Sequence, residues 1–193
     1  MSDFFQASDY AWLLPMVAVA LLLLIWLIFR IARRRGGGLE HALSEISFDR
    51  IDGLVIPSAD EGEILIDYLL LTSHGLLILD VKDVKGTVFG GDKIQDWTVI
   101  NDERRYTFSN PQPSLYDCIA AVRQIVRQVP VAGRILFLDG AKFTKGTPEL
   151  VSSLSALVSE FGEPDKKAAK FKIEAFTPHW ELIRKKALST RSD

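Results

Sequence analysis

The sequence is poor in the side chains that most often bind metals or form crosslinks. It contains one cysteine, Cys118, and three histidines among 193 residues. A single cysteine excludes an intramolecular disulfide and a zinc site built from several thiolates. His41, His74 and His179 are too scattered in sequence to give the spacing of a metal-binding motif. Such cysteine usage fits a reducing compartment, and the chemistry has to be sought among other side chains.

The chain also lacks an excess of positive charge. It has 23 lysines and arginines against 25 aspartates and glutamates, a formal net charge of -2. Four of the arginines and two of the aspartates lie in residues 1–35, so 19 basic and 23 acidic residues remain beyond them. That balance excludes the broad positive field of a general nucleic-acid binder. Any contact with nucleic acid has to be made through a local patch.

One long segment lacks charge altogether. Residues 11–29, AWLLPMVAVALLLLIWLIF, contain no charged residue and consist of aliphatic, aromatic, methionine and proline side chains. A helix of this length spans the ~30 Å hydrocarbon core of a bilayer. Trp12 and Trp26 lie near its two ends, as in interfacial aromatic belts, and Pro15 is near the start, where a helix tolerates proline. We expect one transmembrane helix here, and a buried core helix is the alternative.

The flanks of this segment give its orientation. Arginines at position 30 and positions 33–35 follow it directly, and three glycines close a basic linker over residues 30–38. Because arginine accumulates on the cytoplasmic side of membrane helices, the remainder of the chain is expected in the cytoplasm. Residues 1–10 form an extracytoplasmic tail in this interpretation. They are acidic rather than basic, which disfavours a cleaved signal peptide.

Beyond the linker, apolar runs and turn signals predict alternating helices and strands. Strands are expected at 50–56, 63–71, 76–82 and 133–139, with shorter ones at 96–100 and 104–108. Helices are expected at 39–46, at 114–129 with Ser114 as the N-cap, at about 148–161 and at 179–188. The order α-β-β-β-α-β-α predicts an α/β fold, a mixed β-sheet flanked by helices and preceded by the membrane helix.

Charged residues interrupt two of the apolar strands. The run LILDVKDVKG, residues 77–86, places Asp80 and Lys82 two positions apart, and Asp67 interrupts ILIDYLLL in the same way. Charged side chains are rarely buried unless they are paired or bind a ligand. Since strand side chains alternate between faces, Asp80 and Lys82 share one face of their strand.

The turn between the two strands decides which charges meet. A two-residue turn at Ser73 and His74 sets Asp67 directly opposite Asp80. Moving this turn one residue along the chain sets Asp67 opposite Lys82 instead, and a three-residue turn breaks the alignment. In the first two cases the three charged side chains share one face of the hairpin.

Two facing carboxylates repel each other unless a cation or a shared proton lies between them. Oxygen ligands at this separation suit Mg²⁺, and a neighbouring lysine can stabilise the charge that grows on a phosphate. We therefore expect Asp67, Asp80 and Lys82 to be the catalytic residues of a metal-dependent phosphodiester hydrolysis, with both aspartates as metal ligands. The alternative is that Asp80 and Lys82 mark the end of the strand in water, with Asp67 in a salt bridge to Lys82.

Several ordered segments resemble the NERD (nuclease-related) domain. They are IDYLLLTSHGLLILDVKDVKGTVFG, then Trp97, then NPQPSLYDCIAAVRQIV and RILFLDGAKF, within residues 39–140. That family is assigned to the PD-(D/E)XK nuclease-like group, whose restriction-endonuclease-like core has the order α-β-β-β-α-β. The resemblance implies that Asp67 and Asp80 match the two family acids and Lys82 the family lysine. Asp80 stands where the family usually has glutamate.

The resemblance also implies a nucleic-acid partner, DNA or RNA. Lys85 and Gln112 are the expected substrate contacts, and Ser114 stands where the family often has glutamine. Lys85 could also line a phosphate-binding groove with Lys93, Arg104 and Arg105, and the alternative for these four is an ordinary solvated surface.

The resemblance and the composition together set the expected domain limits and function. A NERD-like domain is expected over residues 39–162, followed by a basic, helical extension over residues 163–193. The expected function is that of a membrane-anchored, Mg²⁺-dependent nuclease-like protein acting on DNA or RNA at the cytoplasmic face. The alternative is a non-catalytic module that keeps the nuclease fold and binds nucleic acid or a protein at the membrane.

Overall fold

The computed structural model describes residues 38–57, 62–163, 165 and 167–190. The chain divides into two compact units, residues 1–40 and residues 41–193, and the fold below is that of the second. The transmembrane helix expected at 11–29 lies outside the described residues, as do the tail and almost all of the linker. Within the described part of the chain, no helix combines the length and the apolar character needed to cross a bilayer.

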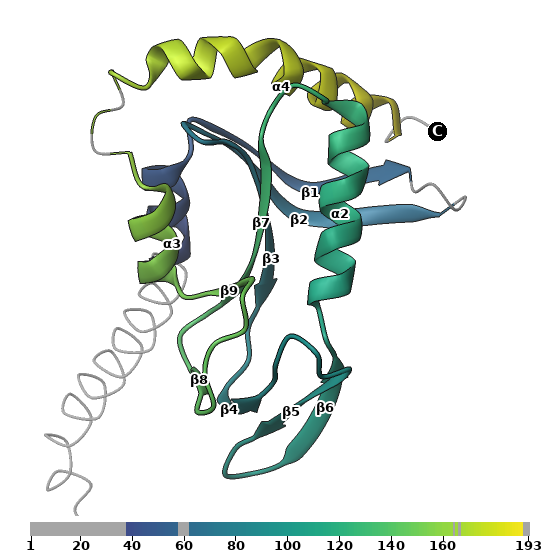
Figure 1. Ribbon diagram of the computed structural model, residues 1–193, viewed down its shortest axis with the longest axis vertical. Helices are drawn as coiled ribbons and strands as arrows, with labels where there is room; N and C mark the ends of the chain where they lie inside the picture. The colour runs from purple at the N-terminus through teal and green to yellow at the C-terminus, as the bar shows by residue number, and fades with distance from the viewer. Residues whose placement is uncertain (1–37, 58–61, 164, 166, 191–193) are drawn as a thin grey trace, which may run out of the picture. The chain divides into compact units, whose positions relative to one another are not determined.

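A five-stranded mixed sheet, sheet A, forms the centre of the fold (Figure 1). Its order is β1-β2-β3-β7-β9; the first three strands are antiparallel neighbours, and β7 and β9 add in parallel. The strands are β1 (Asp49–Pro57), β2 (Glu63–Thr72), β3 (Gly75–Lys82), β7 (Val131–Phe137) and β9 (Val151–Ser152). The first four confirm the strands expected from the apolar runs, with ends moved by one or two residues.

The β2–β3 hairpin has the two-residue turn. Thr72 pairs with Gly75, which leaves Ser73 and His74 as the turn residues. The Thr72 hydroxyl accepts a hydrogen bond from the His74 N–H at 3.1 Å and donates one to the Gly75 carbonyl at 2.9 Å. Gly75 has φ +117°, and a Cβ there would lie 2.3 Å from the Pro130 carbonyl oxygen. The backbone thus requires glycine at this position, and the hairpin register is fixed at its turn.

Helices cover both faces of sheet A. Residues 38–46 are helical, and α2 (Gln112–Ile125) and α3 (Leu154–Phe161) pack against β7. A Cβ at Gly133 of β7 would touch Leu115 and Ile119 of α2, whereas the neighbouring Arg134 pairs with Glu160 of α3. Because successive side chains of a strand point to opposite faces, α2 and α3 cover opposite faces.

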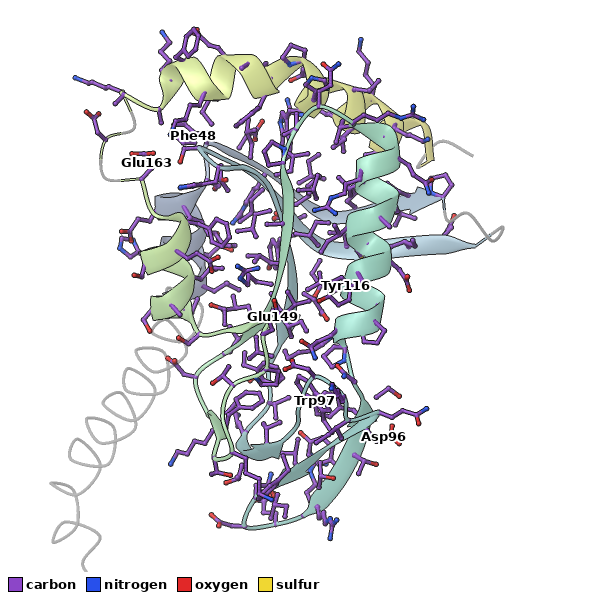
Figure 2. All side chains as sticks on the ribbon, in the orientation of Figure 1. Phe48, Asp96, Trp97, Tyr116, Glu149 and Glu163 are labelled. Carbon is purple, nitrogen blue, oxygen red and sulfur yellow. The ribbon has the colours of Figure 1, made fainter. Side chains whose placement is uncertain are left out.

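A second mixed sheet, sheet B, is inserted between β3 and α2 and completed after β7. Its order is β6-β5-β4-β8, with β4 (Gly86–Phe89), β5 (Asp96–Ile100), β6 (Arg105–Ser109) and β8 (Ala141–Phe143). Trp97 (Figure 2) is fully buried at its centre. Its ring contacts those of Phe108, Phe137 and Phe143. Phe137 belongs to β7, so the aromatic cluster joins the two sheets.

The start of α2 corrects one expectation. The helix begins at Gln112 with Pro111 as its N-cap, so Ser114 lies inside the first turn and is not the cap. The N–H of Gln112 donates to the Asn110 side-chain oxygen at 3.0 Å. Pro113 has no N–H to satisfy, and the first turn of a helix tolerates such a residue. The helix ends at Ile125, four residues before the expected end.

The last two helices also differ from expectation. The helix expected from 148 starts only at Leu154, because residues 151 and 152 pair with β7 as β9. Ser153 caps it, its hydroxyl accepting from the Ala156 N–H at 3.3 Å. The helix expected at 179–188 is α4 (Lys170–Thr190), which contains Pro178 and packs on β1 and β2.

Candidate functional site

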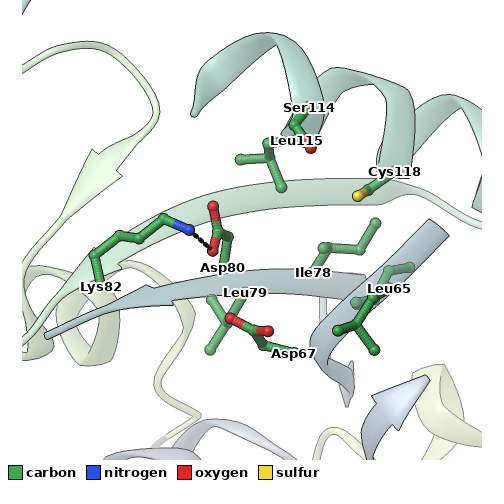
Figure 3. A pocket seen from close by; sticks show the side chains of 10 residues that line it. Leu65, Asp67, Ile78, Leu79, Asp80, Lys82, Ser114, Leu115 and Cys118 are labelled. Carbon is green, nitrogen blue, oxygen red and sulfur yellow. Dashed lines mark ion pairs between the residues drawn. The ribbon is translucent and has the colours of Figure 1, made fainter. Parts of the chain in front are cut away.

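A cavity of about 180 Å³ opens between β2, β3 and the first turns of α2 (Figure 3). Asp67, Asp80 and Lys82 all line it, so the structure brings the three expected site residues together. Ser114 adds a hydroxyl from α2. The apolar lining consists of Leu65, Ile66, Ile78, Leu79, Leu115 and Cys118.

The strand register explains why these side chains meet. Leu69 of β2 pairs with Ile78 of β3, so Asp67 and Asp80, each two positions further from the turn, follow on the same face. This is the face that α2 covers, and Lys82 continues it by two more positions. The hairpin predicted from the two-residue turn therefore gives the arrangement seen here.

Regular pairing of β2 with β3 stops immediately before Asp67. The last ladder pair is Tyr68 with Leu79, and the N–H of Val81 then donates to Asp67 Oδ2 at 2.9 Å. A side-chain oxygen thus accepts a hydrogen bond on this side in place of a backbone carbonyl. Because this hydrogen bond holds one oxygen of the Asp67 carboxylate, the backbone of β3 sets the orientation of the whole group.

The strand on the other side of Asp67 is also irregular. The paired residues of β1 and β2 on either side place Gly53 opposite Asp67, yet Gly53 itself is not part of the ladder. Gly53 has φ +63°, in the left-handed region, and a Cβ there would meet nothing within 4 Å. Backbone conformation therefore favours glycine here, whereas packing does not. The sequence interpretation missed this residue; a glycine inside a strand pattern is the signal that could have found it.

The closest charge contact in the cavity is between Asp80 and Lys82. Lys82 Nζ lies 2.6 Å from Asp80 Oδ1, with 33% and 23% of the two side chains exposed. The alternative expectation of a salt bridge between Asp67 and Lys82 is wrong, because Lys82 pairs with Asp80. Asp67 takes its hydrogen bond from the β3 backbone, and the lysine pairs with the aspartate two positions before it on the same strand face.

Burial is the main influence on Asp80. It raises the pKa of the Asp80 carboxyl above its ordinary value of 3.8, against the opposing effect of the Lys82 ammonium. The facing Asp67 carboxyl adds to the rise. The Asp67 carboxylate is thus close enough to disfavour the charge on Asp80, which is the electrostatic condition that a bound cation relieves.

Cys118 faces the same cavity from α2. Burial, followed by the charges of Asp80, Asp117 and Asp67, raises the pKa of its thiol from 9.0 to about 11. A thiol with such a pKa stays protonated at neutral pH, and the thiolate is the nucleophilic form. Cys118 therefore serves as a small wall residue of the cavity.

The cavity offers few ligands to a divalent ion. Among the described residues, no three His, Cys, Asp or Glu side chains are grouped so as to hold a metal. Mg²⁺, however, keeps several of its waters and is commonly held by one or two carboxylates together with substrate phosphates. Asp67 and Asp80 supply two carboxylates that line one cavity, so the residues present fit Mg²⁺ of this kind.

Lys85 and Gln112, the two expected substrate contacts, do not line this cavity. Lys85 borders a separate hollow of about 470 Å³ together with residues 101–104 and Tyr106. Gln112 is buried, and its side-chain oxygen accepts from the Leu150 N–H at 3.4 Å. In the structure Gln112 therefore holds the start of α2 against the segment before β9.

The fold is a mixed α/β domain with two mixed sheets flanked by helices. Residues 39–138 match the family described as nuclease-related domain, NERD. The match covers 100 of the 193 residues and includes Asp67, Asp80 and Lys82, and the chain belongs to this family. No curated protein and no solved structure matches the chain.

Proposed function

We propose that the protein is a membrane-anchored nuclease that hydrolyses phosphodiester bonds of DNA or RNA with Mg²⁺. The observation that carries this proposal is the single cavity in which Asp67, Asp80 and Lys82 meet. NERD domains are related to nucleases that are commonly metal-dependent, and the membership of this chain supports the same class of reaction. The identity of the ion as Mg²⁺ rests on the all-oxygen donor set.

Each of the three residues has a distinct role in the proposal. Asp67 and Asp80 would hold the ion, which when bound polarises a phosphate and lowers the pKa of a water. The Val81 N–H keeps the Asp67 carboxylate oriented through the bond to Oδ2. Lys82 neutralises Asp80 at 2.6 Å in the absence of substrate and offers its ammonium to a phosphate oxygen when substrate binds.

The location of the protein is part of the proposal. Residues 11–29 would span the membrane once, with residues 1–10 outside and residues 30–38 as the cytoplasmic linker, because the arginines follow the apolar run. The nuclease-related domain would occupy residues 39–162 in the cytoplasm, with residues 163–193 as its extension. Protease added outside intact cells should then leave the domain uncut. Digestion of the domain under these conditions would show that the orientation is the opposite one.

A non-catalytic module is the second candidate. The chain beyond residue 35 is acidic overall, and the cavity lysine is already engaged by Asp80. A nuclease fold with these properties could bind nucleic acid or a protein at the membrane without cleaving it. This candidate predicts binding that is indifferent to Mg²⁺.

A cleavage assay separates the two candidates. The full chain in detergent is incubated with single-stranded DNA, duplex DNA and RNA in the presence of Mg²⁺ or Mn²⁺. The nuclease proposal expects products that disappear with a chelator. Lys82→Ala should lower the rate by about 10² to 10³, the usual effect of removing one charge-stabilising donor.

Lys145→Ala is the matched control, because this exposed lysine does not line the cavity. It should cleave at the parent rate. Cleavage that survives Lys82→Ala unchanged would assign the activity to another site or to a contaminant. Binding without any cleavage, at equal strength with and without Mg²⁺, would establish the non-catalytic module.

A further inference from the structure

Helix α4 has one face in the core. Trp180 and Ile183 are fully buried against the sheet, with Ile173 and Phe176 partly buried beside them. The Trp180 Nε1–H donates to Asp49 Oδ2 of β1 at 2.9 Å, and Arg184 reaches the same oxygen at 2.8 Å. This spacing of three and four residues accounts for the apolar positions on the inner face of the helix.

The opposite face of α4 carries a second apolar row. Phe171, Ala175, Pro178 and Leu182 are spaced by four, three and four residues, which places them in one line along a helix. All four are exposed, Phe171 by 81% and Leu182 by 49%. A helix that is anchored by its inner face needs no such row for its own folding. We call these four residues the outer row.

The charge of α4 is opposite to that of the rest of the chain. Residues 170–190 contain five lysines and arginines and two glutamates, a net charge of +3, in a chain whose net charge is -2. Lys172 and Lys186 lie on one flank of the outer row and Lys185 on the other, and all three are exposed. Lysines in these positions can rest their methylene stems along an apolar surface while the ammonium groups reach a polar layer.

We infer that the outer row of α4 docks on the surface of an anionic lipid bilayer. An exposed aromatic and aliphatic row flanked by lysines is the composition of helices that lie in the headgroup region. Nucleic acid would match the lysines but would gain little from the aliphatic side chains between them. The inference rests on α4 alone, and it holds or fails independently of the proposed nuclease site and of the proposed membrane helix.

The test places a reporter within the outer row of the full chain. Ala175→Cys is labelled with an environment-sensitive fluorophore and reconstituted into vesicles of phosphatidylcholine, with or without about one third phosphatidylglycerol. We expect the label to enter an apolar environment in the anionic vesicles, and to be quenched there by lipids carrying a shallow nitroxide. Raising the salt should reverse the change because it screens the lysines.

Two labels serve as references. Thr177→Cys is exposed on another side of the same helix and should report no lipid contact. The parent chain, whose own Cys118 is buried, is carried through the labelling to show its background. An equal response at positions 175 and 177, or none at 175, would overturn the inference.

Matched variants then identify the side chains responsible. In the Ala175→Cys background, Phe171→Ser should lower the ratio of docked to undocked label in anionic vesicles at least about tenfold, and Lys185→Gln about fivefold. Ile94→Ser is the control, since Ile94 has the same 49% exposure as Leu182 but lies in the loop between β4 and β5. It should behave as the parent.

Three results would contradict docking of the outer row on a bilayer. A response to added DNA or RNA without lipid would assign it to nucleic acid. A response that grows with protein concentration in lipid-free detergent would assign it to a second copy of the chain. A response unchanged by Phe171→Ser would remove the outer row as its cause. Each of these results overturns docking on a bilayer.

Discussion

The two sheets of this domain differ in how regularly their strands pair. Sheet B is filled by interlocking aromatic rings around Trp97, and its β5–β6 ladder runs without interruption from residue 96 to 109. Sheet A departs from regular pairing on both sides of Asp67, at Gly53 in β1 and at Val81 in β3. The comparison shows that the candidate site lies where the sheet exchanges backbone pairing for a side-chain contact.

The two sheets are nevertheless mechanically joined at the end of β3. Lys82 is paired in register with Phe137 of β7, and its carbonyl accepts from the Leu138 N–H at 3.1 Å. The ring of Phe137 stacks on Trp97 with 6.2 Å between centroids. Sheet B thus supports the end of β3 that carries Lys82. Loss of packing in sheet B should therefore also disturb the position of this lysine in the cavity.

The largest effect is expected from the centre of sheet B. Trp97→Ala should lower the free energy of unfolding by about 3–5 kcal/mol, because the deletion leaves a cavity among three aromatic rings. Denaturant titration of the variant and the parent gives this value. Trp97→Phe keeps an aromatic ring in place and should lower the free energy of unfolding by less.

The same titration shows whether the sheets unfold together. Because Phe137 joins the two sheets, we expect them to unfold in one cooperative transition. Far-ultraviolet circular dichroism and tryptophan fluorescence should report the same midpoint. Two separate transitions, with sheet A unaffected by Trp97→Ala, would show that sheet B unfolds as an independent unit.

A smaller effect is expected at the irregular point of β1. Gly53→Ala should lower the free energy of unfolding by about 1–2 kcal/mol, the cost of the left-handed region for a residue with a Cβ. Gly53→Asn should lose less, since asparagine tolerates that region. Thermal melting compares the two variants.

Gly146→Ala is the matched control for Gly53→Ala. Gly146 also has a positive φ, +95°, and open space where a Cβ would lie, but it does not line the cavity. Both substitutions should destabilise the fold, whereas Gly53→Ala alone should also weaken metal binding through its effect on Asp67. Equal metal binding in the two variants would show that Gly53 has no part in orienting the carboxylate.

The smallest expected effect on stability is at Asp80. Because burial raises the folded-state pKa above 3.8, the ionised carboxylate lowers stability at neutral pH, and this penalty fades as the pH falls through the folded pKa toward 3.8. Asp80→Asn should therefore melt level with the parent or above it at pH 7, by a margin that shrinks toward pH 4. A variant that melts well below the parent at pH 7 would show that the pair with Lys82 dominates instead.

The hairpin and its charges could be predicted from the sequence because their causes are local. The short polar turn between two apolar runs fixes the register, and side-chain alternation then places Asp67, Asp80 and Lys82 on one face. Membership of the NERD family was likewise predicted from the ordered segments and is confirmed by the match over residues 39–138.

Other features depend on partners far away in the chain. The residues of β9 follow a helix-like pattern, but they pair with β7 because parallel neighbours are set by tertiary packing. Strand β8 has three residues and is defined by its pairing with β4. The helix expected at 179–188 starts at Lys170, because Ile173 and Phe176 pack against the core and extend α4 back through Pro178. The Asp80–Lys82 pair depends on rotamers, which alternation does not determine.

Calorimetric titration with Mg²⁺ and Mn²⁺ tests the central claim, that the two aspartates form a metal site, most directly. The parent should bind one ion, and Asp67→Asn and Asp80→Asn should each weaken binding by at least about tenfold, the usual lower range for groups around a metal. Lys82→Ala should bind nearly as the parent does, although it loses cleavage. No binding by the parent, together with lower melting temperatures in all three variants, would contradict the account and leave a structural ion-pair cluster in its place.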